Sequence, residues 1–199
     1  MESENKQIKQ MTFSSAILGE AGMLVLALFF IYMREFEPSY WGNLRATEAI
    51  VYGVVGGFLS YLVIGATYLV PGSFTEDLKK QVAALKPMFD KMANWQLVVI
   101  GISAGIAEEF LFREVLQTWV KGYLGGLWAV IAASLAFGFA HAISIGYIIL
   151  TVLIGLVLGY LYEVTGSLVL VMMIHGVYDI IALLVIRHKP EWLKLSVTV

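Results

Sequence analysis

The stretch GIAEEFLFREVL, residues 105–116, places four charged side chains inside a long apolar segment. They are Glu108, Glu109, Arg113 and Glu114. Ionisable groups are costly inside a bilayer, so a charged residue within a membrane helix is by default a functional-site hypothesis. Whether this stretch lies in a membrane depends on the composition of the whole chain.

The composition is typical of a membrane protein. The chain has 199 residues, of which 59% are hydrophobic and 14% are charged, and its mean hydropathy is +0.81. A soluble domain is about half apolar and about a quarter charged. The absence of cysteine excludes disulfides and thiolate chemistry. A net charge of −2 argues against nucleic acid as a partner.

Six apolar segments are long enough to span a bilayer, which takes about 20 residues of helix. They are residues 13–33, 47–70, 95–118, 123–142, 145–163 and 166–186. Helices satisfy their own backbone groups in lipid, so we predict an all-α bundle of about six spanning helices. We expect residues 1–199 to form a single transmembrane domain, in which the first span is a retained helix and not a cleaved signal peptide.

Residues 71–94 differ from the spans, because apolar residues recur there at helical spacing between lysines. This pattern predicts an amphipathic helix on the membrane surface, with a solvated linker helix as the alternative. Basic residues in short loops mark the cytoplasmic side. The larger group comprises Lys6, Lys9, Lys79, Lys80, Lys86, Lys91, Arg187, Lys189 and Lys194, against Arg34, Arg45 and Lys121 on the other side. We therefore expect an integral, multi-pass protein of a prokaryotic cell membrane with both termini in the cytoplasm.

Helical geometry sorts the charges of residues 105–116. Residues four apart lie about 40° apart around a helix, and neighbours lie about 100° apart. Glu109 and Arg113 therefore share a face and can form an ion pair. Glu108 points elsewhere, so its carboxylate is free to react. We expect Glu114, near the end of the span, to reach water.

Two later segments carry the histidines that can join Glu108. Phe137 and His141 share a face in FGFAH, and His175 and Asp179 share a face in HGVYD. A carboxylate near a histidine can hold and deprotonate a water, and a second histidine can donate to the oxyanion. Glu108, His141 and His175 would also suit zinc with an open fourth position, although no H-E-x-x-H is present.

The segments EEFLFR, FGFAH and HGVYD resemble, in order, the E-E-x-x-x-R, F-x-x-x-H and H-x-x-x-N/D motifs of one family. It is the CPBP family of intramembrane proteases, also called the Abi or type II CAAX prenyl endopeptidase family. The resemblance covers about residues 95–186, which would form a four-helix catalytic core. It implies a helical membrane bundle with a cavity open to the cytoplasm, and hydrolysis of peptide bonds in or near the membrane.

The resemblance also implies roles for single residues. Glu108 would activate water with the help of His141, Glu109 and Arg113 would be the supporting ion pair, and His175 and Asp179 would stabilise the oxyanion. The prenyl endopeptidases have Asn at the last position. An ionised Asp only accepts hydrogen bonds, so we infer that Asp179 orients His175 or stays protonated. The expected mechanism requires no cofactor, and a zinc enzyme is the alternative.

The depth of these residues in the membrane leads to a further expectation. His141 lies close to the end of its predicted span, whereas Glu108 and His175 lie deeper. We therefore expect the fourth helix to continue past His141 into AISIGY. Glu20, inside the first span, matches no motif. Gly53 and Gly57, like Gly155 and Gly159, are spaced for close helix packing.

The sequence favours a protease that acts on a membrane-associated protein or peptide, and two alternatives stay open. Glu and His within a membrane also form proton relays, so a proton-coupled transporter is one of them. A non-enzymatic immunity or scaffold protein on the same fold is the other. The sequence does not indicate the oligomeric state.

Overall fold

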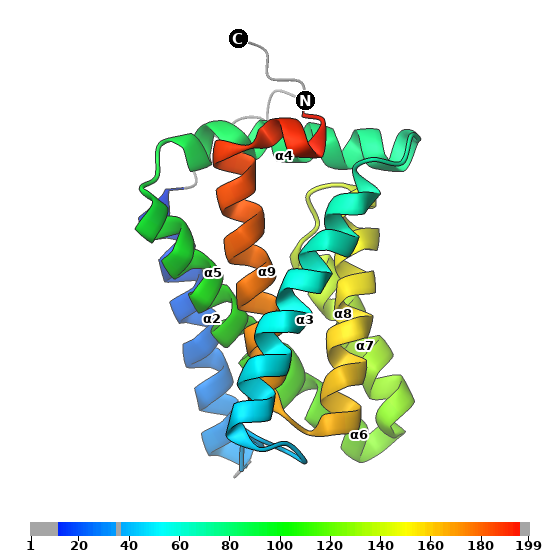
Figure 1. The fold of residues 1–199 in the computed structure, drawn as a ribbon. Helices are drawn as coiled ribbons and strands as arrows, with labels where there is room; N and C mark the ends of the chain where they lie inside the picture. The colour runs from blue at the N-terminus through cyan, green and yellow to red at the C-terminus, as the bar shows by residue number, and fades with distance from the viewer. Residues whose placement is uncertain (1–11, 35–36, 196–199) are drawn as a thin grey trace.

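The computed structural model describes residues 12–34 and 37–195, and the regular structure within them is helical. The helices in chain order are α2 (Phe13–Arg34), α3 (Ala46–Thr67), α4 (Ser73–Asp90), α5 (Asn94–Glu109), the π-helical η1 (Phe110–Gln117), α6 (Thr118–Leu124), α7 (Gly126–Ala140), α8 (Ile145–Thr165), α9 (Leu168–His188) and the short η2 (Pro190–Leu193). Most of them run roughly along one axis, and α4 lies across one end of the bundle (Figure 1). The predicted all-α bundle is therefore confirmed.

Five helices in the described part of the chain are long and apolar enough to cross a membrane. They are α2, α3, the continuous helix Asn94–Leu124, α8 and α9. Large apolar side chains on their outer faces are exposed, among them Leu18, Val63 and Leu153. An apolar outer surface of this size needs a lipid solvent, so the chain is a multi-pass membrane protein.

The fourth predicted span, residues 123–142, is shorter than expected. The helix α7 has 15 residues, which gives a length of about 22 Å against a hydrocarbon core of about 30 Å. The expectation that it continues past His141 is wrong. The hydroxyl of Ser144 accepts a hydrogen bond from the backbone N–H of Tyr147 and so caps the start of α8. The next helix begins at once, and His141 is left in a short loop.

The backbone hydrogen bonding of the third span changes where its charged residues lie. Residues 94–124 form one helix, but its middle part, η1, is π-helical. The sequence gives no sign of this change. π-Helical segments are rare in proteins, and those that occur are often found at functional sites. Here the wider turn belongs to the segment that buries Arg113, Glu114 and Gln117.

Glycines let the long helices approach closely. A Cβ atom at Gly53 or Gly57 of α3 would collide with Met173 or Val177 of α9, and one at Gly155 of α8 would lie 3.1 Å from Ser134 of α7. The close packing predicted at these positions is confirmed. The same device operates between α5 and α9, where a Cβ atom at Gly105 would lie 2.7 Å from the backbone nitrogen of Gly176.

We predict that Gly105→Ala destabilises the protein by about 1–3 kcal/mol, the usual cost of overpacking a core. The added methyl group meets the backbone of Gly176 and Met172, and a backbone cannot move aside as a flexible side chain can. Thermal unfolding of the detergent-solubilised protein measures the effect. Gly65→Ala is the control, because a Cβ atom there has nothing within 4 Å. Equal unfolding temperatures of the two variants would contradict the prediction.

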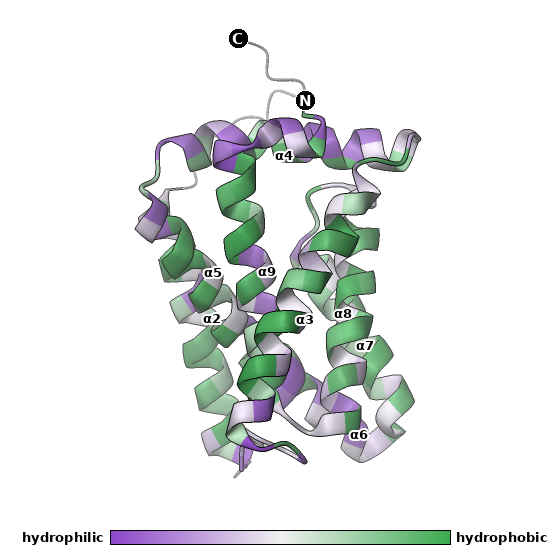
Figure 2. Cartoon of the chain, in the orientation of Figure 1, coloured by the Kyte–Doolittle hydropathy of each residue, from purple (hydrophilic) through white to green (hydrophobic). Residues whose placement is uncertain are grey.

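The helix α4 is the amphipathic helix predicted within residues 71–94. Its buried residues Leu78, Val82, Leu85 and Phe89 belong to a hydrophobic cluster that also includes Leu150 of α8 and Ile186 of α9. Hydrophilic residues gather on α4, while apolar residues cover the long helices (Figure 2). Its place on the membrane surface stays a prediction, as does the cytoplasmic location of the termini. Lys6 and Lys9, which entered that prediction, lie outside the described residues.

Candidate active site

Three separate elements bring Glu108, His141 and His175 together. Glu108 lies one residue before the end of α5, His141 follows α7, and His175 lies in the middle of α9. The Oε2 atom of Glu108 is 3.5 Å from Nε2 of His141 and 4.0 Å from Nε2 of His175. One carboxylate oxygen thus faces both imidazole rings, and the three side chains meet although α7 ends before His141.

Glu109, the next residue on the same helix, links two partners of its own. Its Oε2 atom accepts a hydrogen bond of 2.9 Å from Nε of Arg113, and its Oε1 atom lies 2.8 Å from Nδ1 of His175. The side chains of Glu109 and Arg113 are fully buried. The ion pair predicted from the four-residue spacing is present, and it also holds a catalytic candidate, which the sequence did not predict.

The orientation of His175 follows from these contacts. An ionised carboxylate can only accept, so the ring donates Nδ1–H to Glu109 and presents Nε2 to Glu108. The sequence predicts that Asp179 orients this ring or stays protonated. The Oδ2 atom of Asp179 is 3.6 Å from Nε2, on the side of the ring that faces Glu108. The shorter contact is with Glu109, so Glu109 sets the ring's orientation and Asp179 lies beside Nε2.

His141 is held by a contact with α7, the helix that precedes it. Its Nδ1 atom lies 2.9 Å from the backbone oxygen of Phe137. A carbonyl only accepts, so Nδ1 carries the hydrogen and Nε2 points to Glu108. The ring of Phe137 is 4.6 Å from the ring of His141 and 5.8 Å, edge to face, from that of His175. The guanidinium of Arg113 lies over the same Phe137 ring, 5.3 Å from its centre.

A cavity of about 150 Å³ opens beside the two histidines. A water molecule occupies about 30 Å³ of liquid volume, so the cavity has room for several. Its polar lining includes His141, His175, Asp179 and Tyr147, and Val82 of α4 forms part of its wall. Oε2 of Glu108 is buried and has no hydrogen-bond partner among the described residues. A buried carboxylate oxygen of this kind is where a bound water is expected.

The arrangement allows general-base chemistry. A carboxylate next to an imidazole can hold a water and take its proton, and an imidazole N–H can donate to a developing oxyanion. Zinc was the alternative, with Glu108, His141 and His175 as ligands. Within residues 12–34 and 37–195, no group of three such side chains is arranged to hold a metal ion.

Two further acidic residues have surroundings that the sequence did not predict. Glu114 does not reach water: it is 2% exposed and accepts a hydrogen bond of 2.7 Å from the hydroxyl of Tyr162. Glu20 faces α5 across a lateral groove that Ser103 and Ala107 also line, and its Oε2 atom is buried without a hydrogen-bond partner in the described part of the chain. No hydrogen bond or ion pair joins Glu20 to the other described residues of the site.

Fold and site together define a polytopic helical membrane protein with a buried carboxylate that faces two imidazoles. Residues 90–181 match the family model of the type II CAAX prenyl endopeptidase Rce1-like proteins. Over 162 residues, 81% of each chain, the sequence is 30% identical to the uncharacterized protein YpbD of Bacillus subtilis (strain 168). No solved structure gives a significant match. The chain belongs to the Rce1-like, or CPBP, family, as its three motifs predicted.

Proposed function

We propose that this protein is an intramembrane endopeptidase that hydrolyses a peptide bond of a membrane-associated protein or peptide. The observation that carries the proposal is the environment of Glu108. Its Oε2 atom is buried, lacks a hydrogen-bond partner among the described side chains and backbone groups, and faces the Nε2 atoms of His141 and His175. Membership of a family of prenyl endopeptidases supports the same reaction class.

The proposed reaction begins with a water bound between Glu108 and His141. Glu108 takes a proton from the water, and the water oxygen attacks the peptide carbonyl carbon. Glu109 at Nδ1 and Asp179 near Nε2 favour a doubly protonated His175, whose Nε2–H donates to the oxyanion. When the tetrahedral intermediate collapses, the C–N bond breaks and Glu108 returns its proton to the leaving amine. The products are a carboxyl group and an amine.

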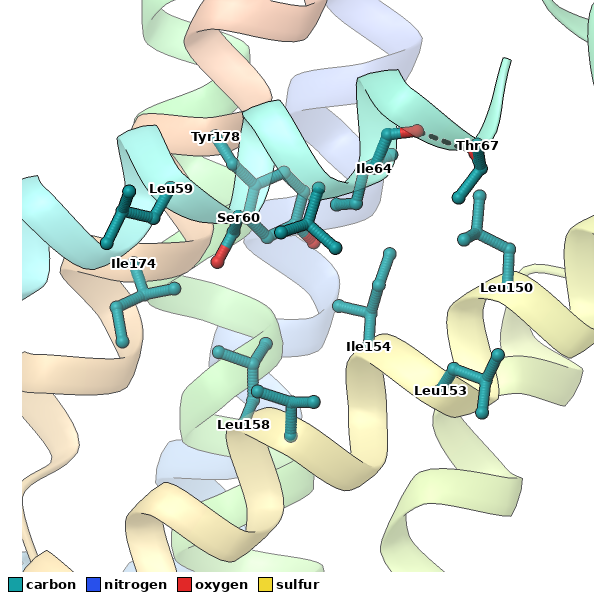
Figure 3. A pocket seen from close by; sticks show the side chains of 12 residues that line it. Leu59, Ser60, Ile64, Thr67, Leu150, Leu153, Ile154, Leu158, Ile174 and Tyr178 are labelled. Atoms are coloured by element: carbon teal, nitrogen blue, oxygen red, sulfur yellow. Dashed lines mark hydrogen bonds between the residues drawn. The ribbon is translucent and has the colours of Figure 1, made fainter. Parts of the chain in front are cut away.

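A second, apolar groove is consistent with a substrate that enters from the membrane. It lies between α3 and α8, has a volume of about 410 Å³, and is lined by side chains such as Leu59, Leu153 and Leu158 (Figure 3). Ile64, Leu150, Ile154 and Tyr178 line both this groove and the cavity at the histidines. The two spaces are therefore neighbours that share a wall. We infer that an apolar segment of the substrate lies in the groove while its peptide bond reaches Glu108.

This inference predicts that Leu153→Trp slows cleavage of a membrane-embedded substrate about tenfold or more. Leu153 lines the groove but not the cavity at the histidines, so the larger ring fills the groove and leaves the catalytic groups in place. Cleavage of a short soluble peptide with the same scissile bond should change less than twofold. Leu127→Trp, at an exposed position of α7 outside the groove, is the control. Equal effects on the two substrates would contradict the inference.

Quantitative proteomics of membrane peptides tests the proposed function directly. Membranes from cells that produce the wild-type protein are compared with membranes from cells that produce Glu108→Gln at the same level. We expect an intact membrane protein to accumulate in the variant, and its cleavage products to appear only with the wild type. Identical peptide profiles would argue against a protease. A cellular effect that survives Glu108→Gln would favour a binding or scaffold role.

A further inference from the structure

The loop that carries His141 lacks the support of a helix. The helix α7 ends at Ala140, and α8 begins at Ile145. Within the loop, backbone hydrogen bonds reach back to the end of α7 or stay inside the loop, such as the one from Ile143 to His141. His141 is also the most exposed of the three residues that meet at Glu108, with 27% of its side chain accessible. The residues of α7 orient His141 itself, through Phe137 and Gly138, so something outside α7 must hold the loop that follows it.

The contact that does this comes from α4. Oδ2 of Asp77 accepts a hydrogen bond of 2.5 Å from the hydroxyl of Ser144 and one of 3.0 Å from the backbone N–H of Gly146. Ser144 ends the loop and caps α8, and it is three residues from His141. A Cβ atom at residue 146 would lie 2.5 Å from Oδ2 of Asp77, so the glycine leaves room for this contact. One carboxylate thus binds both the last residue of the loop and the first turn of α8.

Asp77 is itself held firmly. It lies in the first half of α4. The next residue, Leu78, is fully buried in the hydrophobic cluster that α4 forms with α8 and α9. One turn further along the same helix, Val82 lines the cavity at the two histidines. The hydroxyl of Thr75 donates to the backbone oxygen of Thr67 and fixes the start of α4. The helix α4 is therefore a rigid support that reaches both the cavity and the loop.

We propose that Asp77 is a positioning residue of the active site: it anchors the loop of residues 141–144 to α4 and so holds His141 against Glu108. This inference rests on the proposed function for its kinetic consequence but not for the anchoring itself. It assigns a role to Asp77 of α4, which precedes the part of the chain that matches the family model. The hydrogen bond from Ser144 lowers the pKa of Asp77, so the group that accepts both bonds is a carboxylate at neutral pH.

The anchoring is tested without reference to catalysis. The chain has no cysteine, so Ala142→Cys introduces a single thiol for a nitroxide label at an exposed position of the loop. We expect Asp77→Ala to increase the label's mobility clearly, Asp77→Asn to increase it less, and Glu76→Ala to leave it unchanged. Glu76 is the matched control, because it is exposed and pairs only with Lys79 among the described residues. Equal mobility in Asp77→Ala and Glu76→Ala would overturn the proposal.

A second label separates anchoring of the loop from folding of α4. A nitroxide at Lys80→Cys, on the exposed side of α4, should report the same mobility with and without Asp77→Ala, because the apolar face still holds the helix. Mobility gained at both labels would show that Asp77 supports α4 as a whole, and would overturn a role specific to His141.

The kinetic consequence is a fall in kcat with little change in KM. A displacement of about 1 Å in a catalytic group can cost about 100-fold in rate, so we expect a loss of that order in Asp77→Ala and a smaller one in Asp77→Asn. An unchanged kcat in Asp77→Ala would overturn the proposal. A wild-type protein that hydrolyses no peptide, but whose loop still loosens in Asp77→Ala, would refute the proposed function and leave the anchoring intact.

Discussion

Replacing Glu108 by Gln is expected to lower the rate of peptide hydrolysis by about 1,000-fold or more while the protein stays folded. A positioned general base contributes about 100-fold to 10,000-fold, and an amide oxygen cannot take a proton from water. Glutamine has nearly the shape of glutamate and can still accept a hydrogen bond. The change therefore removes the chemistry of Oε2 and keeps the packing of this side chain, which is 5% exposed. Turnover of the substrate by the purified protein in proteoliposomes measures the effect.

The matched control is Glu114→Gln. Glu114 lies six residues further along the same continuous helix and is as deeply buried, but it accepts a hydrogen bond from Tyr162 and has no contact with the histidines among the described residues. An amide oxygen can accept that bond as well, so we expect less than a fivefold change in rate. Full activity in Glu108→Gln, or an equal loss in both variants, would refute the role assigned to Glu108.

The local parts of this site could be predicted from the sequence because helical spacing determines them. The four-residue spacing of Glu109 and Arg113 gives their ion pair, and the same spacing places Phe137 under His141. The length of the apolar segments predicted the positions of the long helices. Each of these predictions depends on one helix alone.

The parts that could not be predicted depend on several helices or on backbone detail. The hydrogen bond between Glu109 and His175 joins residues 66 apart in the sequence, and that between Asp77 and Ser144 joins residues 67 apart. Both require the packing of α5 on α9 and of α4 on α8, which no spacing rule supplies. The short α7 could have been anticipated, because Ser144 is a good helix cap, but the apolar run on both sides of it concealed the break.

Replacing Arg113 by Met is expected to destabilise the protein by about 3–5 kcal/mol, the usual cost of breaking a buried ion pair from one side. The guanidinium is fully buried and compensates the charge of Glu109, which is fully buried as well. Once Arg113 is gone, only His175 remains hydrogen-bonded to that carboxylate among the described residues. Unfolding of the purified protein in mixed micelles measures the loss of stability.

A double variant distinguishes this cause from a simple loss of packing. Replacing a whole buried ion pair by uncharged groups is often neutral, so Glu109→Gln added to Arg113→Met should restore most of the lost stability. It should not restore hydrolysis, because His175 then lacks the carboxylate that fixes its Nδ1–H and favours its protonated form. If the double variant were as unstable as Arg113→Met alone, packing of the arginine against Phe137 would explain the loss, and the charge of Glu109 would not. If the double variant were both stable and active, Glu109 would have no part in orienting His175.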